Sequence, residues 1–368
     1  MLERLRSAAG EGRPVRFSGA GTKLGWGPRV EGAEILGVEA KEIREHNAGD
    51  LTAVVDAGLP LHELQETLAE EGQMLALDPP LGPDAAATLG GIVAASDSGP
   101  LRHRYGSARD LVVGMTVALS DGTVAQSGGK VIKNVAGYDL SKLFTGSYGS
   151  LGAILQLSLR LHPLSPENAT AVGRSSDSAA LAAAALELSH ARIELQSLDV
   201  RWEGGAGSVL ARFGGAAASA PADDAAETMK GHGLETEVSP EDAEWWGDQR
   251  EAQRSDSGVV VRVSGLQSQL ATTLELARDL DARVVGRAGL GLSWITFPDG
   301  GDPVATVDDV RRRLAPSPCV VLDAPDSVRE SMDVWGPSDP GAAMLMQRVK
   351  ERFDPAGVCA PGLIGARR

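Results

Sequence analysis

The chain has 368 residues, more than one hydrophobic core usually organises, so two domains are expected. Hydrophobic residues make up 42% and charged residues 23%, which is typical of a folded globular protein and excludes a disordered one. The formal net charge of -15 repels phosphate backbones and anionic lipid, which argues against nucleic acid as a partner.

The cysteine content and the hydropathy of the sequence limit the kinds of site and the cellular locations that are expected. Cys319 and Cys359 are the only cysteines and lie far apart, so the chain alone builds neither a disulfide framework nor an iron–sulfur or zinc-thiolate site. A reducing compartment fits this usage best. No stretch approaches the ~20 apolar residues of a membrane span, and residues 1–6 mix charges. We therefore expect a cytoplasmic protein that is peripheral to a membrane only through partners.

The first part of the chain, residues 1–165, reads as one α+β domain. Its pattern begins with a polar helix and a strand that runs into a glycine-rich turn, and short β-branched runs then alternate with helical spacing. An Asp-Gly turn at 121–122 joins two strands. The expected helices are 1–12 and 61–71. The expected strands are 14–18, 53–58, 111–119, a short strand that follows the Asp-Gly turn and includes residue 124, and 154–161.

Composition shifts after Pro166, which predicts a second domain over 166–340 with alternating strands and helices of the α+β kind. A last amphipathic helix at 341–353 ends before Pro355, and residues 341–368 are expected to return to the first domain. Within 166–340 the expected helices are 178–190, 221–231, 266–280 and 304–314, and the expected strands are 195–203, 207–213, 258–264 and 291–297.

The first motif is the run Arg16–Lys23, in which Gly19 and Gly21 let successive backbone N–H groups approach a diphosphate. Ser18 and Thr22 add hydroxyl donors. Taken alone, the run is equally consistent with an ordinary turn after a strand. It does not complete the G-x-G-x-x-G nucleotide fingerprint, and a Walker A sequence is also absent.

Two further motifs follow, at 88–106 and at 133–154. In this order and spacing, the three motifs resemble the FAD-binding domain shared by vanillyl-alcohol oxidase, the D-2-hydroxyacid dehydrogenases and the glycolate oxidase E subunits. The runs 78–102 and 128–139 are similar to the E subunits in particular. The tail 353–362 is similar to that family's F-D-P-x-G-x-x-N-P-G pattern, with Ala360 where Asn is usual. The resemblance covers residues 14–163.

This resemblance implies a vanillyl-alcohol-oxidase (PCMH) type fold, with two subdomains that bind FAD and a ferredoxin-like α+β cap. Thr22 stands where covalent relatives have a histidine, so noncovalent FAD is expected. The first loop would hold the pyrophosphate, the second segment would pass the diphosphate and flavin, and the third would line the adenosine and ribityl side. The implied FAD-binding residues are Ser18, Gly19, Ala20, Gly21, Thr22, Lys23, Pro79, Thr88, Gly91, Ser96, Gly99, Arg102, Tyr105, Gly106, Gly149, Gly152 and Ile154.

Three cations near these motifs, Arg102, Arg104 and Lys133, either offset the charge of the cofactor or form a solvated basic face. The tyrosines Tyr105, Tyr138 and Tyr148 all fall within the motifs, where packing explains them better than proton transfer does. His103 is expected to be a surface or phosphate-side residue. No catalytic residue is assigned. Four residues of the second domain are the first candidates to face a flavin, although tryptophan is more often core: Trp245, Trp246, Arg262 and Trp294.

The histidine-rich metal site of D-2-hydroxyacid dehydrogenases has no counterpart here, because the remaining histidines are scattered singly, and no metal is expected. The resemblance therefore implies an FAD-binding subunit that takes part in oxidation of a 2-hydroxy acid by hydride transfer to flavin. Its partners would be a D-type flavin subunit and an iron–sulfur subunit. A stand-alone FAD-dependent alcohol or sugar oxidase and a catalytically silent flavin-binding scaffold remain open alternatives.

Overall fold

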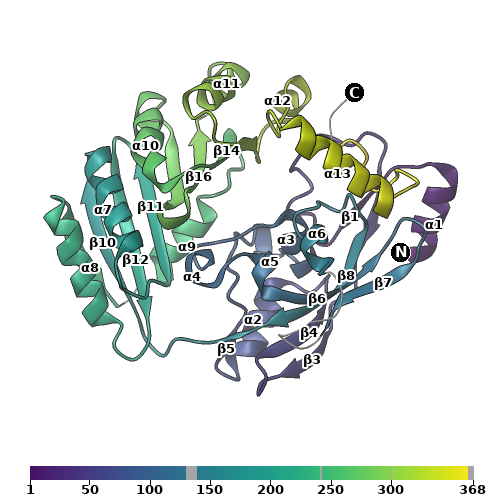
Figure 1. Cartoon of the computed structure of the whole chain (residues 1–368), viewed down its shortest axis with the longest axis horizontal. Helices are drawn as coiled ribbons and strands as arrows, with labels where there is room; N and C mark the ends of the chain where they lie inside the picture. Colours follow the sequence, from purple (N-terminus) through teal and green to yellow (C-terminus); the bar gives the residue numbers. More distant parts are fainter. Residues whose placement is uncertain (130–138, 241–242, 299, 364–368) are drawn as a thin grey trace. The chain divides into compact units, whose positions relative to one another are not determined.

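The computed structural model describes residues 1–129, 139–240, 243–298 and 300–363. The chain folds into two compact units, and Figure 1 labels many of their helices and strands. The first unit comprises Met1–Ser98, Gly106–Leu164 and Ser338–Arg368, and the second comprises Gly99–Tyr105 and Ser165–Pro337. Each unit has its own apolar core, as expected for a chain of this length.

The first unit is built on a five-stranded antiparallel sheet in the order β3-β4-β8-β6-β7. Two smaller sheets accompany it, the parallel pair β1-β2 and the antiparallel pair β5-β9. Every residue of β4 is buried, as its β-branched sequence favours for a strand near the middle of a sheet. The strands are β1 (Val15–Ser18), β2 (Glu34–Gly37), β3 (Ile43–Asn47), β4 (Thr52–Asp56), β5 (Gln73–Met74), β6 (Val112–Ala118), β7 (Val124–Gly128), β8 (Ala153–Arg160) and β9 (His162–Pro163).

The helices of the first unit pack on this sheet by their apolar faces. Leu61, Leu64 and Leu68 recur at helical spacing and are all buried in the core. Phe353 of the last helix meets Phe144 edge to face, with ring centroids 5.5 Å apart. The helices are α1 (Leu2–Glu11), α2 (Leu61–Ala69), α3 (Leu89–Ala95), α5 (Ala108–Leu111), α6 (Ser141–Phe144) and α13 (Pro340–Phe353).

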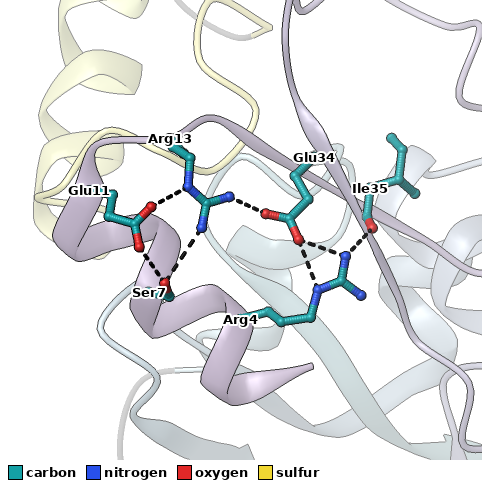
Figure 2. Close-up of polar contacts among 6 residues, drawn as sticks. All are labelled: Arg4, Ser7, Glu11, Arg13, Glu34 and Ile35. Atoms are coloured by element: carbon teal, nitrogen blue, oxygen red, sulfur yellow. Dashed lines mark hydrogen bonds and ion pairs between the residues drawn. The ribbon is translucent and has the colours of Figure 1, made fainter.

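A network of exposed ion pairs holds α1 beside β2 (Figure 2). Glu34 accepts hydrogen bonds from Arg4, whose Nε is 2.8 Å away, and from Arg13. Arg13 also donates to Glu11 at 2.6 Å. The hydrogen bonds from Arg4 and then Arg13 lower the pKa of Glu34 below its usual value. Because the network is exposed, salt is expected to screen it.

The second unit contains one eight-stranded antiparallel sheet in the order β13-β10-β12-β11-β15-β16-β14-β17. This order arises from two successive βαββαβ units, each with the connectivity of a ferredoxin-like fold, joined edge to edge where β11 pairs with β15. The elements are β10 (Asn168–Ser175), α7 (Ser178–His190), β11 (Ser197–Glu203), β12 (Ala206–Gly214), α8 (Ser219–Gly231), β13 (Glu235–Ser239), α9 (Ala243–Glu251), β14 (Val259–Ser264), α10 (Leu270–Asp279), β15 (Arg283–Arg287), β16 (Leu292–Phe297), α11 (Pro303–Arg313), β17 (Cys319–Val321) and α12 (Asp326–Ser331), with α4 (Arg102–Tyr105).

The two faces of this sheet differ. Alternate strand residues such as Val200, Val284 and Ile295 join the core that α7, α8, α10 and α11 cover. On the opposite face, Trp246 of α9 packs on Val172 and Leu210. The ferredoxin-like α+β sheet is therefore confirmed and is present twice, with α7, α8, α10 and α11 on one face and α9 on the other.

Candidate functional site

The first unit contains a cavity of about 710 Å³, counting the open space at its mouth. Three stretches far apart in sequence form most of its wall: the loop after β1, the start of α3 and the segment that leads into β8. The lining residues are Arg16, Phe17, Ser18, Gly19, Ala20, Gly21, Thr22, Lys23, Leu24, Val38, Ala57, Thr88, Gly90, Gly91, Ala94, Ala95, Tyr148, Gly149, Gly152 and Ile154.

The loop after β1 lies against the N-terminal cap of α3. A Cβ atom on Gly19 would stand only 2.1 Å from Oγ1 of Thr88, so no larger residue fits there without moving α3. Thr88 is the N-cap, and its hydroxyl accepts the backbone N–H of Gly91 at 3.4 Å. Gly21 has φ of +80°, a conformation that glycine adopts without strain. The loop therefore presents backbone in place of side chains to the cavity.

The segment before β8 uses glycine in the same way. Gly149 has φ of +74°, and Gly152 has φ of +146°, which glycine alone adopts readily. A Cβ atom on Gly152 would lie 2.4 Å from the carbonyl oxygen of Ala118 in β6. Two opposite parts of the wall thus expose main-chain groups, as a cavity that admits a diphosphate requires.

A buried cation lies at the same wall. Nζ of Lys23 is 3.3 Å from Oδ2 of Asp97, and both side chains are buried. Within the part of the chain that the structure describes, neither of these two atoms has a hydrogen-bond partner of good geometry. The Lys23 ammonium also lies 5.8 Å from the ring centroid of Trp26. The bare backbone and this cation fit the negative charge of an FAD diphosphate.

The cavity brings together many of the residues that the sequence assigns to FAD, and the others lie elsewhere in the chain. Pro79 is buried away from the cavity wall, and Ser96 caps the end of α3 with φ of +51°. Gly106 lies against Asp110 with φ of +82°. The predicted residues that line the cavity are Ser18, Gly19, Ala20, Gly21, Thr22, Lys23, Thr88, Gly91, Gly149, Gly152 and Ile154.

Three of the assigned residues, Gly99, Arg102 and Tyr105, belong to the second unit, where α4 begins at Arg102. Arg104 of this helix is exposed and donates to Glu194 at 3.1 Å, as a solvated basic face would. His103 is half-buried, and burial lowers its pKa. Lys133 and Tyr138 lie outside the described residues.

The wall also contains residues that the sequence prediction did not include. The small-residue run 85–95 was the available signal for Gly90, Ala94 and Ala95. Val38 and Ala57 carry no local signal, because the tertiary fold alone brings them to the cavity. Val38 reaches it by donating its backbone N–H to the carbonyl of Ser18 at 2.8 Å.

The candidates in the second unit fall into two kinds. Trp246 is a core residue, since it packs on the sheet and its indole N–H donates to Thr170 at 2.9 Å, and Trp245 packs against the same cluster. Arg262 and Trp294 lie opposite each other on adjacent strands.

Among residues 1–129, 139–240, 243–298 and 300–363, no group of three or more His, Cys, Asp or Glu side chains is arranged to hold a metal ion. Over the same ranges, the helices are too short or too polar to cross a membrane.

Comparison with known proteins places the cavity in context. Residues 1–128 match the FAD binding domain family. The glycolate oxidase subunit GlcE of Escherichia coli is 37% identical over 164 residues, which is 44% of this chain and 46% of that protein. The GlcD subunit of Bacillus subtilis is 33% identical over 165 residues, 44% of this chain and 35% of that protein. A mitochondrial D-lactate dehydrogenase [cytochrome] of Arabidopsis thaliana is 38% identical over 132 residues, 36% of this chain and 23% of that protein.

The chain thus spans less than half the length of these curated relatives, which are FAD-linked oxidoreductases or their subunits. Among solved structures, alkyldihydroxyacetonephosphate synthase aligns with 98% of this chain and 75% of its own length, with a TM-score of 0.69 and 14% identity. At that identity the match establishes the fold alone. Residues 1–128 are therefore similar to the FAD-binding domain family, and the α+β fold of the chain is of the vanillyl-alcohol-oxidase (PCMH) type.

Proposed function

We propose that this chain binds FAD noncovalently in the cavity of the first unit and serves as the FAD-carrying subunit of a glycolate-oxidase-type enzyme. The observation that carries the proposal is the glycine-walled cavity, in which Gly19 has no room for a Cβ atom beside Thr88. FAD, when bound, accepts hydride from the hydroxyl-bearing carbon of a 2-hydroxy acid. The residues of this chain hold the cofactor and fix its position.

The backbone amides of Ser18–Thr22 would hold the pyrophosphate, with Lys23 supplying positive charge close by. Gly149, Gly152 and Ile154 would line the adenosine and ribityl side. The remaining assigned residues, Pro79, Ser96, Gly99, Arg102, Tyr105 and Gly106, stay part of the proposal. Thr22 has no nucleophilic ring nitrogen, so the flavin would remain unattached.

The proposal extends to partners and to the second unit. Similarity to the GlcE and GlcD subunits of glycolate oxidase supports assembly with other subunits. The proposed partners are a D-type flavin subunit and an iron–sulfur subunit, and the proposed compartment is the cytoplasm. Residues 166–340 would act as the cap domain, and 341–368 would complete the FAD domain. Under this proposal the isolated chain binds flavin, and the hydroxy acid reduces that flavin only in the assembled enzyme.

An anaerobic titration tests the proposal. The purified chain is expected to show flavin absorbance that denaturation releases into the supernatant, as noncovalent binding requires. Glycolate or D-lactate should leave that flavin oxidised until the partner subunits are added. Bleaching of the isolated chain would instead support a stand-alone oxidase, and flavin that stays oxidised in the complete complex would support a silent scaffold. A chain that takes up no FAD would refute the proposal.

A further inference from the structure

The face of the second unit's sheet that the main helices leave uncovered carries an unusual set of polar side chains. Because Val284, Ile295 and Val261 point into the helix-covered core, their strand neighbours point the opposite way. The register then aligns these neighbours across four adjacent strands. Arg287 lies opposite Asp199, Arg283 opposite Thr296, and Arg262 opposite Trp294.

These arginines are short of acceptors. Arg287 is fully buried, and only its Nη1 is hydrogen bonded, to Asp199 at 2.6 Å. Its Nε and Nη2 are buried with no partner among the described residues, as are Nε of Arg262, Nε of Arg283 and Oγ1 of Thr296. In the described chain, Arg262 and Arg283 have no ion pair at all. Among the described residues, Asp199 is thus the one carboxylate that pairs with any of these three guanidinium groups.

Arg287 is fully buried, whereas Arg262 and Arg283 are half-buried with Nε shielded from solvent. Buried guanidinium N–H groups without an acceptor are costly, and three guanidinium groups on one face also repel each other. Such an arrangement is unexpected in a chain whose formal net charge is -15, where carboxylates outnumber cations. Trp294 helps to hold the Arg287 side chain in place, because the guanidinium lies 4.9 Å from the centroid of its ring. Arg262 and Arg283 stand on the two strands that flank β16, so their side chains can meet above it.

We propose that this face is a binding site for a small oxyanion, a carboxylate or a phosphate group, held by Arg262, Arg283 and Arg287 with the hydroxyl of Thr296. The planar guanidinium fork matches both groups and offers two parallel hydrogen bonds to each. Only the identification of the anion as the carboxylate of a 2-hydroxy acid rests on the proposed function. The site itself belongs to the second unit and is testable without flavin.

The test uses the full-length chain freed of flavin. Calorimetric titration with glycolate, D-lactate or inorganic phosphate, at constant ionic strength set with chloride, should show binding of at least one of them and a matching rise in Tm. Carboxylate binding identifies a hydroxy-acid site, and phosphate binding alone identifies a phosphate site. Arg262→Gln and Arg283→Gln should each weaken binding by roughly tenfold or more, since each removes a charge-assisted hydrogen bond.

Neither variant should lower Tm in anion-free buffer, because neither arginine has a partner to lose. Arg174→Gln is the matched control: Arg174 stands on the same face in β10 but already pairs with Glu237, so anion affinity should not change. The inference is wrong if the wild type binds none of the three anions, or if both arginine variants bind them as tightly as the wild type. Either result leaves flavin binding, and hence the proposed function, untouched.

Discussion

Replacing Lys350 by methionine is expected to lower the stability of the first unit and to weaken the wall of its cavity. Lys350 is buried on α13, and its ammonium group donates to the carbonyl oxygens of Ser150 at 2.7 Å and Cys359 at 2.5 Å. It also pairs with Asp354 one turn later. Ser150 lies next to the cavity-lining Gly149, so a single side chain ties the C-terminal helix to the wall of the cavity.

The same contact continues along the tail to β1. Asp354 accepts the backbone N–H of Cys359 at 2.8 Å, and residues 358–360 then pair with Val15 through two backbone hydrogen bonds of 2.8 Å. β1 runs directly into the loop Ser18–Lys23. Helix α13 and the tail that follows it therefore contact the segment before β8 and the strand before the loop Ser18–Lys23, both of which line the cavity. Asp354 holds the turn at the start of this tail by accepting the N–H of Cys359.

Lys350→Met keeps the aliphatic stem but leaves Asp354 buried without its counter-ion. Removing one partner of a buried ion pair costs about 3–5 kcal/mol, which corresponds to a fall in Tm of about 6–20 °C for a unit of this size. Calorimetry of the FAD-free chain measures this fall, and fluorescence titration should show weaker FAD binding.

The control is Lys230→Met, which breaks an exposed pair with Glu227 and should change stability by no more than about 0.5 kcal/mol. Adding Asp354→Asn to Lys350→Met should recover part of the loss, since it removes the unpaired charge. The reasoning fails if Lys350→Met is as mild as Lys230→Met.

Three further outcomes are expected. Gly19→Ala should abolish flavin absorbance, because its Cβ would meet Thr88 at 2.1 Å, whereas Gly10→Ala, with open space around it, should retain flavin. Burial raises the pKa of Asp199 from 3.8 to about 6, so the folded state holds this proton more tightly than the unfolded state does. The contribution of Asp199 to the free energy of unfolding therefore falls as pH rises from 3.8 to about 6, and Asp199→Asn should remove that slope in urea titrations. The pKa of Glu34 is lowered in the folded state, so its contribution to the free energy of unfolding is lost as pH falls through this lowered pKa. Glu34→Gln should therefore weaken the dependence of the free energy of unfolding on pH in the acid range at low salt. At 1 M salt, which screens the network, the variant should change this dependence little.

Local sequence signals predicted the elements that depend on local chemistry. The helix expected at 178–190 is observed at Ser178–His190, since Asp177 caps it by accepting the N–H groups of Ala179 and Ala180. The helix expected from 266 begins four residues later as α10. The side chain of Gln269 accepts the N–H of Leu266 and holds a separate turn there.

Strands whose pairing is set by distant partners were missed. β13 is Glu235–Ser239, a polar edge strand, and β17 has only three residues, so neither shows an apolar alternation. β10 and β15 also escaped prediction. Without these four strands, the duplication of the ferredoxin-like unit was not visible in the sequence, although the class of the sheet was predicted correctly.

The same contrast explains what the sequence revealed of the two sites. The loop Ser18–Lys23 is contiguous and rich in glycine, so its chemistry can be read directly. Arg262 lies on an expected strand and is among the candidates to face a flavin, whereas Arg283 and Arg287 lie on β15, which the sequence did not predict. Only the register shows that they lie on the same face, where Arg287 pairs with Asp199.

Both sites depart from the rule that buried charged groups are fully hydrogen bonded. At the cavity the unsatisfied atoms are Nζ of Lys23 and Oδ2 of Asp97, and on the sheet face they include Nε of the three arginines and Oδ1 of Asp199. Departures of this kind are expected at functional positions, because a partner that arrives from outside can supply the missing acceptors. A diphosphate at the first site and a small oxyanion at the second would each supply the acceptors that are absent from the described part of the chain.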